Sequence, residues 1–246
     1  MTDTTQHPDA TVRNAPHRRY VLSLAGIFVL LALWSGFAPK HRQDWLLENL
    51  LVLLAAPILW AIYRRLPFSR LSWTFVFAFL CLHELGAHYT YSEVPYNEWW
   101  RALTGSSFND LVGWDRNNFD RIIHVFYGLF LAYPIREIFL HLAKVRGFWS
   151  YFLPFDLTLS SSALYEMIEW GAACFFGGEL GAAYLGTQGD PWDAQKDMAL
   201  AAAGALAAMT LTACINRKCQ RDFAREWADS LRVHPPDNAP PTPGRP

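Results

Sequence analysis

Several apolar stretches of the sequence carry carboxylate and imidazole side chains in pairs. The paired residues, in chain order, are Glu84 and His88, Asp120 and His124, Glu166 and Glu169, and Asp193 and Asp197. Each pair is spaced by three or four residues, so on a helix both side chains share one face. Charged groups within membrane hydrocarbon are costly unless something pairs with them. These pairs therefore indicate a functional site.

A mixed set of histidines and carboxylates suits a divalent metal such as Zn, Mn or Fe. We predict that the metal ligands are His83, His88, Asp120, His124, Glu166, Asp193 and Asp197. His83 directly precedes Glu84, so the two side chains diverge by about 100° around a helix. In this hypothesis Glu84 or Glu169 is the catalytic base, which activates a water molecule at the metal.

Two other interpretations fit the same residues. Shared protons would make a proton- or cation-coupled transporter, or an ion-binding membrane protein without catalytic activity. Alternatively, the carboxylates could pair with Arg121 or Lys196 and only hold the helices together. Polar residues do not continue into the inner halves of the apolar stretches, which counts against transport. The sequence HELGAH is not the H-E-x-x-H zinc motif, because its second histidine is one position late.

The composition is that of a membrane protein. Of the 246 residues, 52% are hydrophobic and 17% are charged, whereas soluble domains carry about a quarter charged residues. Eleven Trp are typical of the aromatic belts at membrane surfaces. The net charge of −1 gives no indication of nucleic-acid binding, and we expect none. The four cysteines lack metal-motif spacing, so we expect them to be free.

We predict an all-α fold, a polytopic membrane protein with a six-helix transmembrane bundle. The expected spans cover approximately residues 20–38, 45–63, 71–91, 119–140, 150–176 and 192–215. The first of them is close to the ~20 residues that a bilayer requires. The last span is rich in Ala and Gly, which favours close contact with another helix.

The segments outside the spans have their own expected structures. Residues 1–19 are expected to form a disordered cytoplasmic tail. The loop 92–117, rich in aromatic residues, is expected to be a partly helical lid at the membrane surface. Residues 216–233 should form an amphipathic cytoplasmic helix and residues 234–246 a Pro-rich disordered tail. Arg136 and Glu137 are expected to form a local ion pair or to contact headgroups.

The distribution of basic residues predicts the orientation. With both termini cytoplasmic, the inner segments hold fifteen of the 21 Lys and Arg residues and the outer segments hold six. The positive-inside rule favours this arrangement. All the paired polar residues then lie at the outer ends of their spans, which predicts that they converge on one outward-facing cluster.

A resemblance supports the membrane assignment. The motifs HELGAHYTYSEVPY, DRIIHVFYGLFLAYPIREIF, SSALYEMIEWGAA and DAQKDMALAAAGAL resemble the YjdF family of bacterial inner-membrane proteins over residues 80–210. That family is a domain of unknown function, so the resemblance implies a polytopic bacterial inner-membrane protein and supplies no reaction. The pattern Asp120-x-x-x-His124, Glu166, Glu169 and Asp197 is also similar to VanZ-like proteins, which are associated with glycopeptide resistance. Glu169 stands where many VanZ-like sequences have Gln.

The leading hypothesis is an outward-facing metal site that acts on a lipid or cell-envelope precursor, most simply by hydrolysis. The aromatic lid would cover the site and hold acyl chains. The alternative is a proton- or cation-coupled transporter, or an ion-binding protein. In either case the first expected partner is the lipid bilayer.

Overall fold

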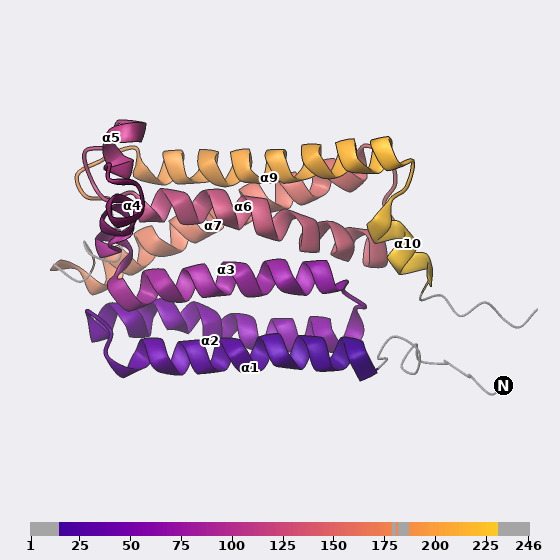
Figure 1. Cartoon of the computed structure of the whole chain (residues 1–246), viewed down its shortest axis with the longest axis horizontal. Helices are drawn as coiled ribbons and strands as arrows, with labels where there is room; N and C mark the ends of the chain where they lie inside the picture. Colours follow the sequence, from indigo (N-terminus) through magenta and orange to yellow (C-terminus); the bar gives the residue numbers. More distant parts are fainter. Residues whose placement is uncertain (1–14, 179–180, 182–186, 231–246) are drawn as a thin grey trace, which may run out of the picture.

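The computed structural model describes residues 15–178, 181 and 187–230. Within them, long helices lie side by side along the longest axis of the molecule, and successive helices run in opposite directions (Figure 1). These helices are α1 (Ala15–Phe37), α2 (Arg42–Arg65), α3 (Arg70–Tyr89), α6 (Phe119–Ile138), α7 (Trp149–Phe176) and α9 (Asp193–Cys219). No strand occurs in the described residues, so the predicted all-α fold is confirmed.

Short helices mark the two ends of the bundle. The single-turn η1 (Tyr91–Glu93), α4 (Tyr96–Thr104) and α5 (Phe108–Val112) follow α3, and Figure 1 shows α4 and α5 at one end. At the opposite end, η2 (Phe139–Ala143) extends α6, and α10 (Phe223–Ser230) follows α9. We refer to these as the α4 end and the α10 end. The predicted lid is thus partly helical.

Four helices are long and apolar enough to cross a membrane: Pro16–Phe37, Arg42–Arg65, Phe119–Ala143 and Asp193–Cys219. The chain is therefore a membrane protein by the composition of its own helices. Helices α3 and α7 lie alongside these four but are not among them, and they carry buried carboxylates, including Glu84 in α3 and Glu166 in α7. The six-span count consequently remains a prediction.

The helix boundaries differ from the expected ones at two places. Helix α1 begins at Ala15, inside the segment expected to be a tail. Helix α9 continues to Cys219 and ends where Gln220 adopts a left-handed conformation. Helix α10 then starts after Asp222, whose side chain accepts a hydrogen bond from the backbone N–H of Arg225. The amphipathic segment is thus interrupted. Residues 1–14 and 234–246 lie outside the described residues.

Helices α6 and α9 form the tightest contact in the bundle, and glycines make it possible. A Cβ on Gly128 of α6 would lie 2.0 Å from the carbonyl oxygen of Ala201. A Cβ on Gly204 of α9 would lie 2.1 Å from the carbonyl oxygen of Val125. Only glycine permits such a close approach from both sides. The contact fixes how the two helices sit against each other over their first halves.

The remaining helices pack around this pair. Helix α7 packs against both α6 and α9, α3 packs against the opposite side of α6, and α1 packs against α3. Helix α2 packs mainly on α3 and is the least enclosed of the long helices. The arrangement places the starts of α6 and α9 and the later turns of α3 and α7 at the α4 end (Figure 1).

Candidate metal centre at the α4 end

Asp120, His124 and Asp197 form the centre of the candidate site. One possible ligand atom from each residue lies within 4.8 Å of the other two. His124 and Asp197 are buried, and Asp120 is half-buried. Asp120 and His124 share the face of α6 that continues, four residues later, to Gly128. The close α6–α9 contact therefore brings that face against Asp197.

Helix α7 adds two carboxylates to this centre. The Nε2 atom of His124 lies 3.5 Å from a carboxylate oxygen of Glu166 and 3.6 Å from one of Asp120. Glu169 is buried on the same face of α7, and the charges of Asp120 and Glu166 act on it. Asp120, Glu166 and Asp197 thus lie close to the imidazole of His124, and Glu169 lies nearby on α7.

Several of these atoms lack a hydrogen-bond partner among the described residues. They are Nδ1 of His124, Oδ1 of Asp197 and Oε1 of Glu166, all three buried; the Glu166 oxygen is the one 3.5 Å from Nε2 of His124, a contact that is not a hydrogen bond. Buried polar atoms are ordinarily hydrogen-bonded, and an uncompensated buried charge is costly. A bound cation would satisfy these oxygens and offset the repulsion between the carboxylates. The donor set therefore fits a divalent metal.

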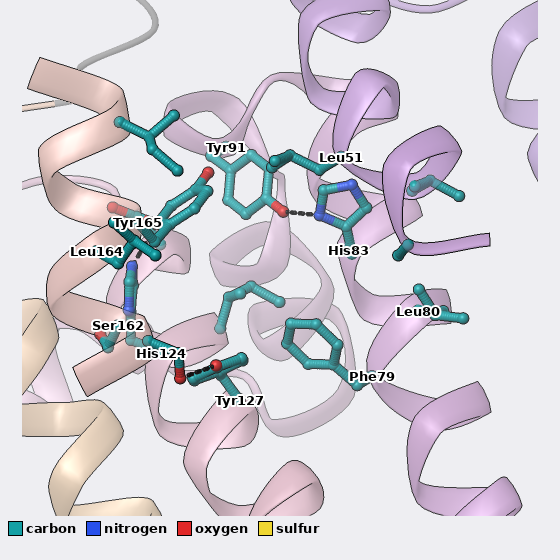
Figure 2. Close-up of a pocket in the computed structure, with 16 residues that line it drawn as sticks. Leu51, Phe79, Leu80, His83, Tyr91, His124, Tyr127, Ser162, Leu164 and Tyr165 are labelled. Carbon is teal, nitrogen blue, oxygen red and sulfur yellow. Dashed lines mark hydrogen bonds and ion pairs between the residues drawn. The ribbon is translucent and has the colours of Figure 1, made fainter. Parts of the chain in front are cut away.

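A pocket of about 300 Å³ adjoins this centre and is shown in Figure 2. Asp120, His124 and His83 contribute polar groups to its lining. The Nδ1 atom of His83 is 2.6 Å from the hydroxyl of Tyr91, which also lines the pocket. Gly86 allows Tyr91 to fold back onto α3, because a Cβ there would lie 2.7 Å from the ring. The structure thus places His83 beside the pocket rather than among the ligand atoms.

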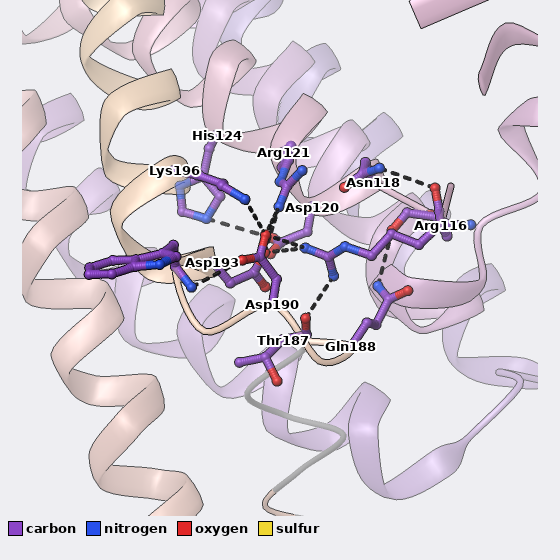
Figure 3. Close-up of polar contacts among 12 residues, drawn as sticks. Arg116, Asn118, Asp120, Arg121, His124, Thr187, Gln188, Asp190, Asp193 and Lys196 are labelled. Atoms are coloured by element: carbon purple, nitrogen blue, oxygen red, sulfur yellow. Dashed lines mark hydrogen bonds and ion pairs between the residues drawn. The ribbon is translucent and has the colours of Figure 1, made fainter. Parts of the chain in front are cut away.

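Asp193 belongs to a separate ion-pair network at the edge of the centre (Figure 3). It pairs with Arg116 and with Arg121, whose Nη2 lies 3.1 Å away. Arg121 also contacts Asp190 at 2.6 Å, and Lys196 contacts Asp190 at 2.5 Å. Because two guanidinium groups already neutralise Asp193, its carboxylate is a poor candidate for a metal ligand. The network ties the start of α9 to the start of α6.

Glu84 and His88 face away from this centre, toward α1. A carboxylate oxygen of Glu84 lies 2.5 Å from the hydroxyl of Ser35. The Nδ1 atom of His88 lies 2.9 Å from the carbonyl oxygen of Ser35, and its ring stacks on Trp34. Helix α3 packs on α1 with one face and on α6 with another. The structure therefore does not bring these two residues together with Asp120.

Glu48 of α2 is a charged residue at this end that sequence reasoning missed. It is buried, its Oε2 atom has no hydrogen-bond partner among the described residues, and the charge of Asp120 acts on it. The signal was a lone carboxylate in the apolar run LLENLLVLL. In a membrane segment a single buried carboxylate indicates a functional role, as do the paired histidine and carboxylate residues of the other helices.

The fold and the site together define an all-helical membrane protein with a buried cluster of histidine and carboxylate groups. Comparison with known proteins gives the family. The family described as "Predicted membrane protein (DUF2238)" matches residues 20–218. The chain is also 34% identical over 195 residues to the inner membrane protein YjdF of Escherichia coli (strain K12), covering 79% of this chain and 89% of that protein.

The chain therefore belongs to the DUF2238 family of membrane proteins, and the predicted resemblance to YjdF is confirmed. No solved structure matches it. The similarity to VanZ-like proteins remains a prediction from the motif alone.

Proposed function

We propose that this protein binds a divalent metal through Asp120, His124 and Asp197 and acts on a lipid or cell-envelope substrate, most simply by hydrolysis. One observation carries the proposal: three potential ligand atoms from two helices lie within 4.8 Å of one another in a largely buried place. Catalytic metal sites commonly use three protein ligands and keep a further position open. The bound ion would polarise a phosphoryl or carbonyl oxygen of the substrate.

The neighbouring carboxylates have distinct roles in this proposal. Glu166 lies within 3.5 Å of His124, so it either completes the ligand set or orients the imidazole. Glu169 lies one turn further along α7 and is the base that accepts a proton from the attacking water. Zn, Mn and Fe all suit a mixed set of imidazole and carboxylate ligands.

We further propose that the protein spans the inner membrane six times, with both termini cytoplasmic and the α4 end facing outward. Two observations support this topology. The six long helices alternate in direction (Figure 1), and basic residues gather in the segments that the topology makes cytoplasmic. The inner-membrane location is supported by the name of the E. coli relative.

A proton- or cation-coupled transporter is the second candidate, because buried carboxylates also carry protons. Transport requires a path to the α10 end. Between the candidate centre and that end, α6 and α9 pack through apolar and small side chains, including Ala132, Ala205 and Met209. This apolar layer favours a site that works from one side.

Metal content tests the proposal directly. Protein purified in detergent and loaded separately with Zn²⁺, Mn²⁺ or Fe²⁺ is measured by elemental analysis, beside Asp197→Asn and a His124→Ala, Asp197→Ala double variant. We expect one metal ion per chain in the native protein and less than a tenth of that in both variants. Asp110→Asn is the matched control, since Asp110 is exposed on α5. Absence of metal from the native protein under all three conditions would overturn the proposal.

A further inference from the structure

The pocket beside the candidate centre is lined mostly by apolar side chains, with a few polar groups among them. The polar groups come partly from α3, α6 and α7 and include Asp120. Figure 2 labels three others, His83, His124 and Ser162. The walls come mostly from aliphatic and aromatic residues of α2, α3, α6 and α7. A mostly apolar lining with a few polar groups suits a ligand that carries both a polar group and hydrocarbon.

The exposed part of the lining lies on the side of the bundle and not at its end. Leu164 and Ile168 of α7 are the exposed residues of the lining, at 54% and 47%. Met167, beside them on α7, is 59% exposed. In a membrane-spanning bundle such apolar side chains contact lipid hydrocarbon. The pocket therefore opens toward the bilayer along α7.

Helix α2 forms the opposite wall through Leu51, Val52 and Ala55. Within the described residues, α2 and α7 do not pack closely against each other. A second hollow, of about 550 Å³ and lined by α1, α2 and α3, shares Val52 with the pocket, so α2 is loosely held on both sides. The opening between α2 and α7 is thus flanked by a helix with few tertiary contacts.

At the α4 end the pocket is covered. Tyr91 folds over it and bonds His83 through its hydroxyl group. Val94 of the following loop is completely buried, and Asn117 donates a hydrogen bond to its carbonyl oxygen at 2.8 Å. A ligand arriving from the aqueous phase would have to displace this cover. A ligand arriving from the bilayer would not.

We propose that a phospholipid enters this pocket sideways from the bilayer, between α2 and α7, and turns its phosphate toward Asp120 and His124. The orientation of the headgroup rests on the proposed metal, because bare carboxylates repel a phosphate group. A volume of about 300 Å³ is at the lower end for small-molecule sites. It accommodates the headgroup and the upper part of one chain, while the rest of the lipid stays in the membrane.

Native mass spectrometry of the metal-loaded protein with added dioleoylphosphatidylglycerol tests this route. We expect one retained lipid per chain in the native protein and at least tenfold less in Ala55→Trp, which fills the pocket. Leu54→Trp is the matched control and should retain the lipid, since Leu54 is 59% exposed and is not part of the lining. Equal retention in Ala55→Trp and Leu54→Trp would overturn the proposal.

A second pair of variants tests the same route from α7. Ile168→Trp obstructs the opening, whereas Met167→Trp, next to it on the chain, leaves it free. We expect loss of the lipid in the first and retention in the second. This pair keeps the test decisive if Ala55→Trp does not fold. Dioleoylglycerol, which lacks phosphate, should be retained at least tenfold less than dioleoylphosphatidylglycerol.

Measuring metal on the same samples separates the two proposals. Ala55→Trp should keep the metal and lose the lipid, whereas Asp197→Asn should lose both. A metal-free native protein whose lipid retention still responds to Ala55→Trp would contradict the metal site and support the sideways route. A metal-loaded protein with no response to either plugging variant would contradict the route and leave the metal site standing.

Discussion

The two ends of the bundle both hold buried charged residues, but the two sets of residues differ in how their charges are paired. At the α10 end, Arg136 is completely buried, and each of its three side-chain nitrogens donates a hydrogen bond. Its Nη atoms bond the carboxylate of Asp222 at 3.0 and 2.5 Å, and Nε bonds the carbonyl oxygen of Ser150 at 3.1 Å. Next to it, Glu137 accepts a hydrogen bond from the backbone N–H of Ser69 at the start of α3.

At the α4 end, by contrast, carboxylates gather around His124 with few donors, and several buried atoms have no partner in the described part of the chain. At the α10 end the buried charge of Arg136 is therefore balanced by Asp222, although Oε1 of the neighbouring Glu137 has no hydrogen-bond partner in the described residues. The carboxylates at the α4 end instead need a ligand or protons to balance their charge. Burial alone would raise the pKa of Asp222, but the Arg136 guanidinium holds that pKa below its usual value. The difference separates a structural ion pair from a candidate site.

The largest effect on stability should come from breaking the ion pair between Arg136 and Asp222 at the α10 end. Arg136→Ala leaves Asp222 without its partner, and we expect the free energy of unfolding to fall by about 3–5 kcal/mol, as for other buried pairs. Thermal unfolding in detergent measures it. Arg217→Ala, exposed at the same end, should change little. Replacing both partners, as in Arg136→Met with Asp222→Leu, should restore much of the loss; a failure to do so would mean that Arg136 acts through contacts other than Asp222.

At the α4 end we expect a substitution to raise the free energy of unfolding instead of lowering it. Asp120→Asn removes one of the mutually repelling carboxylates, so the metal-free protein should become more stable by about 1 kcal/mol, the usual size of such gains at functional sites. Unfolding in the presence of a chelator measures the change. Asp156→Asn is the control, because Asp156 is exposed on α7. A clear loss of stability in Asp120→Asn would show that this carboxylate is structurally paired, like those at the α10 end.

The smallest effect on stability is expected from the ion pairs that border the candidate centre. A hydrogen bond from Lys196, with the backbone N–H of Trp192, lowers the pKa of Asp190 from 3.8 to about 2. A lowered pKa means that the pairing stabilises the fold above about pH 4 and is lost as the pH falls toward 2. The stability difference between the native protein and Asp190→Asn should therefore shrink across that window. A difference independent of pH would exclude the ion pair as its cause.

The sequence was sufficient for the α-helical class and for the central part of the site. Asp120 and His124 share a helix face by spacing alone, and the antiparallel order of the helices places Asp197 at the same depth. The Ala/Gly pattern of the last span also predicted its close contact. These features follow from helical periodicity and from the alternating direction of successive helices, and both can be derived from the sequence.

What the sequence could not give is the direction in which each face points. Glu84 and His88 share a face as predicted, but that face meets α1, since the rotation of α3 is set by packing against two neighbours. Arg136 was expected to make a local or headgroup contact, whereas its partner Asp222 lies 86 residues further along the chain. Glu48 was missed because it stands alone in an apolar run, without a second residue to suggest a face.

The glycine contact between α6 and α9 also restricts how these helices can vary in length. Gly128 and Gly204 hold the two helices in one register, and the site residues precede them on the same helices. One residue inserted between Asp197 and Gly204 would turn Asp197 by about 100° and shift it by about 1.5 Å along the axis, while the glycine contact stayed in place. Insertions and deletions within Asp120–Gly128 or Asp197–Gly204 would therefore dismantle the site without unfolding the bundle.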